Sequence, residues 1–195
     1  MTAAAESIDF LTYYDLEKYL FEVVSPQFAT ERTLSAFHFF CIVIWKANRA
    51  KSKIAKRLLE HGPYSDLDTA VGVLLAEVVA AHSPKDRLRV MMSQWGLLLP
   101  MASAILTILY PDEFTVYDVN VCDVIGDFHK LKNKINFDRI WDGYANYTEA
   151  VKRTAPAELS LRDKDRWAWG KAFVLQLNQD IANNFPRRDT DDADA

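Results

Sequence analysis

The chain has few of the residues that build metal centres or disulfide frameworks. Only two cysteines occur among its 195 residues, Cys41 and Cys122, and they form neither a CxxC pair nor a closely spaced Cys/His set. We therefore predict no metal site, no cofactor and no disulfide framework, which fits a reducing compartment. Glycine is also scarce, and half of the residues are hydrophobic, so most of the chain should fold around a substantial core.

Long apolar runs and a basic N-terminus are missing as well. No uncharged apolar stretch reaches the roughly 18 to 20 residues that a membrane-spanning helix needs. The first residues include Glu6 and Asp9 where a signal peptide would be basic. We therefore expect a cytoplasmic monomer with no membrane partner. The net charge of -4 gives no overall attraction to nucleic acid, although an average can conceal a local basic patch.

Helical periodicity and helix-ending signals divide the chain into helices with short connections, and no long strand is indicated. The predicted fold class is therefore all-α. The first helix should end at Ser25-Pro26, and His61-Gly62-Pro63 should end another. Ser65 and Ser83 are predicted N-caps. The predicted helices span residues 7–24, 30–45, 66–79, 84–94, 100–110, 119–128, 136–152 and 162–184, and a disordered acidic tail follows Pro186.

The stretch from Trp95 to Val121 reads WGLLLPMASAILTILYPDEFTVYDVNV and organises the middle of the chain. It predicts a turn at Gly96, an apolar helix from Pro100 or Met101, and a short extended run that delivers Asp118 to the start of another helix. Together with the preceding helix, the turn forms a helix-hairpin-helix outline. The free N–H groups at the start of its second helix suit a phosphate. Gly96 is equally compatible with a simple helix C-cap.

A basic run lies between residues 46 and 57. It holds six cations and no acid in an otherwise acidic chain: Lys46, Arg49, Lys51, Lys53, Lys56 and Arg57. One interpretation is a solvated helix face. The other is a patch that contacts the phosphates of a nucleic acid.

These segments resemble the helix-hairpin-helix DNA glycosylase superfamily, which includes endonuclease III, the adenine-mismatch glycosylases and 8-oxoguanine glycosylase. The stretch ASAILTILY is similar to the helix after the family's hairpin, and VYDVNV is similar to its V-D-T-H-V element. Without a gap, Asp118 falls on the catalytic aspartate and Gly96 on the first hairpin glycine. The sequence WKANR at residues 45–49 resembles a W-K-x-x-R element of a bacterial branch. The resemblance covers Trp45 to about Phe128.

The resemblance implies two helical lobes with a substrate cleft between them. Residues 29–110 would form the central lobe, residues 1–28 and 111–186 the second lobe, and residues 187–195 the acidic tail. The implied activity is that of a monofunctional DNA N-glycosylase, a hydrolase of base excision repair. It would flip out and excise a damaged or modified base from double-stranded DNA, on the nucleoid of a bacterial cytoplasm.

The chain departs from the family pattern at three signature positions. Leu98 replaces the second hairpin glycine, Pro100 the nucleophilic lysine of bifunctional members, and Asn120 the histidine after the aspartate. The four-cysteine iron–sulfur loop has no counterpart. These departures motivate an alternative: a catalytically inactive DNA-binding or defence-associated module that retains the fold.

The resemblance implies that Asp118 is the catalytic residue. An aspartate at this position is also a typical helix N-cap, and one residue can have both roles. Lys46 is either a phosphate contact or a substitute amine nucleophile. Trp45 is either a stacking wall or a core aromatic. The predicted DNA contacts are Lys46, Arg49, Lys51, Lys53, Gly96, Leu97, Leu98 and Met101. The predicted base pocket consists of Trp45 and Trp141 as stacking walls with Tyr117 and Asn120 as polar readers.

Overall fold

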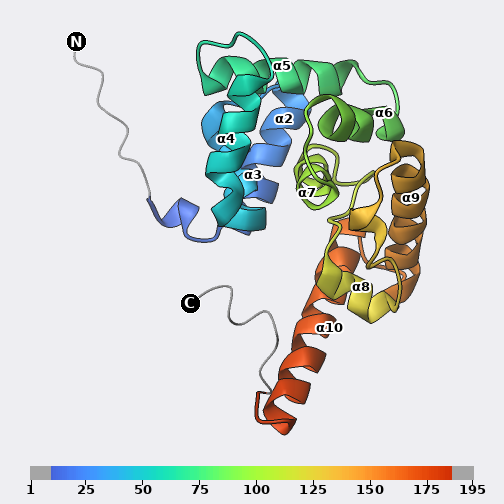
Figure 1. Cartoon of the computed structure of the whole chain (residues 1–195). Helices are drawn as coiled ribbons and strands as arrows, with labels where there is room; N and C mark the ends of the chain where they lie inside the picture. Colours follow the sequence, from blue (N-terminus) through green and yellow to red (C-terminus); the bar gives the residue numbers. More distant parts are fainter. Residues whose placement is uncertain (1–9, 186–195) are drawn as a thin grey trace.

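A computed structural model describes residues 10–185, and every regular element in that range is helical (Figure 1). This confirms the all-α prediction. The start of the first predicted helix and the acidic tail lie outside the described residues. In chain order the elements are η1 (Phe10–Tyr13), α1 (Leu16–Tyr19), η2 (Leu20–Val24), α2 (Ser25–Glu31), α3 (Ala36–Ala47), η3 (Asn48–Ala50), α4 (Lys51–Glu60), α5 (Leu67–Ala80), α6 (Pro84–Arg89), η4 (Val90–Gln94), α7 (Leu99–Leu109), α8 (Val119–Ile125), η5 (Leu131–Asn133), α9 (Phe137–Thr154) and α10 (Leu161–Ala182).

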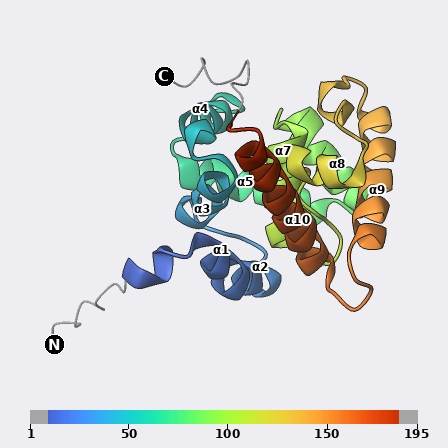
Figure 2. The ribbon, with the colours of Figure 1, turned by 90° about the horizontal axis from the view of Figure 1, so that it is seen from below.

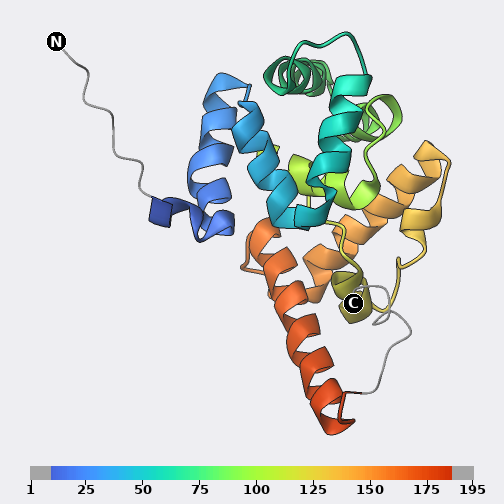
Figure 3. The ribbon, with the colours of Figure 1, turned by 60° about the vertical axis from the view of Figure 1, so that its left-hand side comes forward.

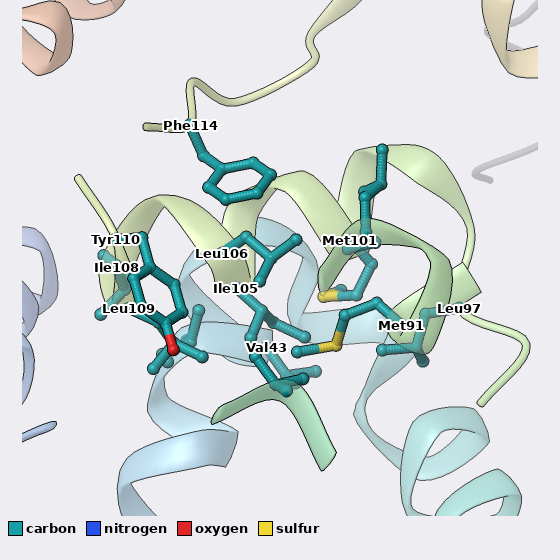
Figure 4. Packing of buried hydrophobic residues seen from close by; sticks show 14 of the residues in the cluster. Val43, Met91, Leu97, Met101, Ile105, Leu106, Ile108, Leu109, Tyr110 and Phe114 are labelled. Atoms are coloured by element: carbon teal, nitrogen blue, oxygen red, sulfur yellow. The ribbon is translucent and has the colours of Figure 1, made fainter. Parts of the chain in front are cut away.

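Helix α7 is the centre of the core. Apart from Pro100, every one of its residues is buried, as the apolar run in the sequence predicts. Figure 4 shows Val43 of α3 and Met91 of η4 gathered in one cluster with Ile105 and Leu106 of α7. Burial of each such large apolar side chain contributes roughly 1.5–3 kcal/mol. The helix is therefore a rigid support for the segment that follows it.

Most helix boundaries follow the local signals in the sequence. Helix α4 ends at Glu60, directly before His61-Gly62-Pro63, and Ser83 caps α6 by accepting a hydrogen bond from the Asp86 amide. The predicted cap at Ser65 is wrong. Asp66 caps α5 instead, with its carboxylate 2.7 Å from the Thr69 amide, and the Ser65 hydroxyl donates to that carboxylate.

The prediction that Ser25-Pro26 ends the first helix is also wrong, because the chain stays helical until Glu31. The five residues before Ser25 form a π-helical turn, which shifts the hydrogen-bond register ahead of the proline. Pro26 is the second residue of α2, directly after this π-helical turn. The helix ends where Arg32 adopts a left-handed φ of 58°.

Helix α7 contacts α2, α3 and α6, and α6 also contacts α9. Helices α1 and α2 pack on α3 and α7, and α8, α9 and α10 pack on one another. Seen from below in Figure 2, α10 runs between the α3–α5 side of the molecule and the α8–α9 side. Its second half extends away from the rest of the molecule (Figure 3). In the described part of the chain, no helix is long and apolar enough to cross a membrane.

Candidate functional site

Residues 114–118 form an extended segment between α7 and α8, and side-chain hydroxyl groups satisfy much of its backbone. The Tyr144 hydroxyl donates to the Thr115 carbonyl (2.6 Å) and accepts from the Thr115 amide (3.1 Å). The Tyr147 hydroxyl donates to the Val116 carbonyl at 2.8 Å. Ser103 of α7 accepts from the amide of Tyr117 at 2.9 Å. These bonds replace the partners that a helix or sheet would otherwise supply to a buried backbone.

Burial keeps the two α9 tyrosines in their protonated form. It raises the pKa of Tyr144 and of Tyr147 above the usual value of 10. Both side chains can therefore donate and accept at any physiological pH. The Tyr147 hydroxyl also lies 3.4 Å from the Asp118 amide, which donates to it. The segment and the residue at its end are thus fixed by α7 on one side and α9 on the other.

Asp118 makes two different contacts with its two carboxylate oxygens. Oδ1 accepts a hydrogen bond from the Asn120 amide at 3.0 Å, which makes Asp118 the N-cap of α8. Oδ2 accepts one from Lys46 Nζ at 2.6 Å. The side chains of Asp118 and Lys46 are 20% and 15% exposed, so the pair is mostly buried but still reaches solvent. Capping and exposure to a cavity therefore occur together at this residue.

The cavity beside this pair has a volume of about 520 Å³, within the usual range for small-molecule sites. Helix α3, the extended segment, α1 and α10 supply its walls, so residues distant in the chain converge there. The lining residues are Glu17, Trp45, Lys46, Val116, Asp118, Arg162, Asp165, Arg166 and Trp169.

A charge network that is buried at Asp165 and more exposed at Arg166 forms the α10 side of the cavity. Asp165 is 3% exposed and pairs with Arg162. Arg162 Nη2 also lies 2.8 Å from Glu17 Oε1, and Arg166 Nε lies 3.1 Å from the same oxygen. Burial raises the pKa of Asp165 to about 6, against the opposing effect of Arg162 and Lys46. The wall therefore holds a carboxyl group that titrates in the mildly acidic range.

Trp45 is both a packing residue and a cavity wall. Its ring meets the Phe21 ring edge-on with centroids 6.1 Å apart, and the Arg162 guanidinium lies 5.2 Å from its centroid. Trp169 stands on the α10 side and stacks parallel to Phe173 at 5.8 Å. The cavity thus combines aromatic surfaces with charges of both signs.

In the segment of the predicted helix-hairpin-helix outline, η4 ends at Gln94 and α7 begins at Leu99, and Gly96 between them adopts a left-handed φ of 65°. A Cβ at this position would lie 3.3 Å from Arg57 Nη1. The amide of Leu97 already donates to the Met91 carbonyl, and that of Met101 to the Leu98 carbonyl. Their side chains are buried, so the amides and side chains of these two predicted contacts face inward. Leu98 is the outward-facing side chain of the hairpin, 69% exposed.

The basic run divides between the cavity and the surface. Lys46 lines the cavity, whereas Arg49, Lys51 and Lys53 are exposed on η3 and the start of α4. Lys51 Nζ donates to Asn48 Oδ1 at 2.9 Å. Because Ile54 and Leu58 turn the other face of α4 into the core, the lysines stay on its solvent side.

Three residues of the predicted base pocket lie outside the cavity lining. The Tyr117 side chain is buried, and its hydroxyl donates to the Phe128 carbonyl at 2.8 Å. Asn120 lies in the first turn of α8, behind the carboxylate that its amide holds. Trp141 packs beside Tyr144 on α9, with ring centroids 6.4 Å apart. Tyr117 and Asn120 are close to Asp118 in the sequence but do not line the cavity. Side chains of the extended segment alternate between its two sides, and the chain changes direction where α8 begins.

The charged residues of the α1 and α10 walls are not among the site residues predicted from the sequence: Glu17, Arg162, Asp165 and Arg166. One signal was present. Asp165 precedes Ala168 and Ala172 at the spacing of a single helix face, and that face is the buried one. A charge on an apolar face indicates a buried partner. Its partners on α1 and α3 cannot be named from that pattern alone.

No group of three or more His, Cys, Asp or Glu side chains within residues 10–185 is arranged to hold a metal ion. Cys41 and Cys122 are buried thiols, and burial raises the pKa of Cys122 to about 11. Neither thiol lines the cavity. The groups available for chemistry there are carboxylates, a lysine amine, guanidinium groups and indole rings.

Compared with known proteins, the chain matches no family model, no curated protein and no solved structure.

Proposed function

We propose that this protein is a monofunctional DNA N-glycosylase of the helix-hairpin-helix type. It flips a damaged or modified base into the cavity and hydrolyses the bond between that base and its sugar. The observation that carries the proposal is the position of Asp118. A firmly held carboxylate forms part of the wall of a cavity large enough for a nucleobase, beside the indole of Trp45.

The chemistry requires a fixed negative charge. As the glycosidic bond breaks, positive charge builds on the sugar and the base leaves with the bonding electrons. A carboxylate next to C1′ stabilises that charge, and it accepts a proton as water adds to the sugar. The ammonium group of Lys46, 2.6 Å from Oδ2, orients the carboxylate. This role needs no lysine at position 100.

Base recognition requires stacking and polar groups in the same cavity. Trp45 and Trp169 supply aromatic surface, and Glu17 and Arg166 supply polar groups near the opening. Both partners of the Arg166–Glu17 ion pair are partly exposed. The identity of the base is therefore expected to depend on residues of α1 and α10. Tyr117, Asn120 and Trp141, predicted from the sequence for this role, lie outside the cavity lining.

Binding of the DNA backbone to the protein requires cations outside the cavity. Arg49, Lys51 and Lys53 directly follow Trp45 and Lys46 in the chain and are exposed. Lysine and arginine contacts to phosphates release counterions, so affinity through this surface should fall steeply as salt is raised.

The decisive experiment compares Asp118→Asn with Asp66→Asn. Both residues are N-caps, and asparagine caps a helix about as well as aspartate, so both variants should fold. Asp118→Asn should retain DNA affinity and lose base release by about 100-fold or more. Asp66→Asn, away from the cavity, should behave as wild type. Wild-type base release by Asp118→Asn would refute the proposal.

The assay uses duplex oligonucleotides carrying one uracil, oxidised purine, alkylated base or modified cytosine each. Strand breaks after alkali report base loss, and mass spectrometry identifies the free base. Binding without breaks for every base would favour the alternative, an inactive DNA-binding or defence-associated module. One observation favours that alternative: the Asp118 oxygen that could meet a sugar is held by Lys46. Failure to bind any duplex at any salt concentration would exclude both.

A further inference from the structure

Within residues 10–185, neighbouring helices cover one face of the first half of α10, and no residue of the helix after Ala172 is buried. The covered face carries Asp165, Ala168 and Ala172, and it packs on α8 and α9. The second half extends away from the molecule (Figures 1 and 3), and Leu175 on one side of it is 56% exposed. Another face, from Trp169 to Ile181, is apolar over a longer stretch. Its large apolar side chains are between 38% and 55% exposed: Trp169, Phe173, Val174, Leu177 and Ile181. This set, with Gly170, is called the α10 stripe below.

The α10 stripe has the spacing of a helix-pairing seam. Gly170, Val174, Leu177 and Ile181 follow one another at intervals of four, three and four residues. On an α-helix these positions lie within about 60° of one another around the axis, opposite Ala172. The same intervals define the a and d positions of a coiled coil. An apolar stripe of this kind on a stable helix indicates a second helix that covers it.

We propose that the α10 stripe pairs with the α10 stripe of a second copy of this chain, in an antiparallel arrangement about a two-fold axis. The axis passes between positions 175 and 176. It sets Val174 opposite Leu177 of the second copy, and Gly170 opposite Ile181 of the second copy. Gly170 has no atom within 4 Å of where its Cβ would be, so its surface is open to a large side chain. The stripe is therefore complementary to itself, as a two-fold interface requires.

The size of the stripe suits a modest dimer. Five large apolar side chains, each exposing about 100 Å², give about 500 Å² per copy. The total of about 1,000 Å² lies at the lower end for specific protein interfaces. A patch of about 500 Å² is comparable to the largest apolar patch on a typical monomer, which is often functional. We therefore expect an equilibrium between monomer and dimer, and not a permanent dimer. This differs from the monomer predicted from the sequence.

The composition of the stripe favours a second copy over a charged partner. From Trp169 to Ala182 the chain contains only two charged residues, Lys171 and Asp180. A nucleic acid or an acidic peptide would find a single cation there, Lys171. Trp169 belongs both to the stripe and to the cavity lining, so the second copy would lie beside the cavity opening.

Sedimentation velocity on the full chain, from about 1 µM to about 300 µM, covers the range in which an interface of this size associates. Wild type should show a concentration-dependent shift from monomer to dimer. Leu177→Lys should weaken dimerisation by about 100-fold, because it buries an unpaired charge in the seam. Leu59→Lys on α4 is the matched control, since the two leucines are 38% and 39% exposed. A wild type that stays monomeric throughout, or equal effects of the two variants, would overturn the proposal.

A mixing experiment tests the antiparallel arrangement. Val174→Glu and Leu177→Lys should each be monomeric alone, because each places a charge against an apolar side chain. Mixed together, they should form a heterodimer with one Glu–Lys pair and one native Val–Leu pair. Circular dichroism of each variant confirms that the exposed substitutions leave the fold intact. If mixing restores no dimer, the antiparallel pairing is wrong.

Discussion

Lys46 Nζ lies 2.6 Å from Asp118 Oδ2, although the two residues are 72 positions apart in the chain. The pair joins the end of α3 to the start of α8, across one wall of the cavity. Because both side chains are mostly buried, loss of either one leaves a charge without its partner in a region that water reaches poorly. The pair therefore couples the stability of the fold to the geometry of the candidate site.

Replacing Lys46 with methionine tests this coupling. The free energy of unfolding should fall by about 1–3 kcal/mol, because the Asp118 carboxylate loses a charged hydrogen-bond partner. Base release should fall as well, since the carboxylate loses its orientation. Urea unfolding and single-turnover base release measure the two effects. Lys56→Met, which removes an exposed pair with Glu60, should change neither; equal losses in both variants would contradict the coupling.

The amine of Lys46 also permits a test of the monofunctional assignment. A lysine that attacked C1′ of an abasic sugar would form an imine, which borohydride reduces to a stable protein–DNA adduct. We expect no adduct, because Asp118 and water suffice for hydrolysis. An adduct that forms with wild type and Lys53→Arg but not with Lys46→Arg would identify Lys46 as a nucleophile. The protein would then be a bifunctional lyase.

Features that depend on residues adjacent in the chain could be predicted from the sequence. Features that depend on how distant helices pack could not. Helix α7 and the cap at Asp118 follow from a local apolar run and a local residue preference. The cavity wall that contains Asp165 does not, because tertiary packing rather than local sequence brings α1 and α10 beside α3. Trp141 illustrates the same limit: its type suits a stacking wall, but the packing of α9 leaves it outside the cavity lining.

The two α9 tyrosines support different parts of the extended segment, and their phenylalanine variants should differ accordingly. Each variant leaves buried backbone groups without a partner and should cost about 1–3 kcal/mol of stability. Tyr147→Phe removes a contact to the Asp118 amide, whereas Tyr144→Phe removes contacts to Thr115 alone. Base release, measured where both variants are folded, should therefore fall further in Tyr147→Phe. A larger loss in Tyr144→Phe would show that Tyr147 does not position Asp118.

Asp165 gives the fold a pH dependence of unusual sign for a carboxylate. Burial raises its pKa to about 6 in the folded chain, from an ordinary value of 3.8. Between these two values the folded state binds more protons than the unfolded state. The free energy of unfolding should therefore decrease as pH rises from about 4 to about 6, by at most about 3 kcal/mol from this group. Above that window its contribution is constant.

The test is the difference in unfolding free energy between wild type and Asp165→Asn, measured by urea unfolding at several pH values. Asparagine does not titrate, so the variant should gain stability relative to wild type as pH rises through the window. Asp138→Asn is the control of opposite sign, because hydrogen bonding and attraction by Lys85 lower the pKa of Asp138. Its carboxylate stabilises the fold above pH 3.8, and that contribution is lost as pH falls through the lowered pKa. A pH-independent difference between wild type and Asp165→Asn would mean that Asp165 keeps its charge throughout, with Arg162 outweighing burial.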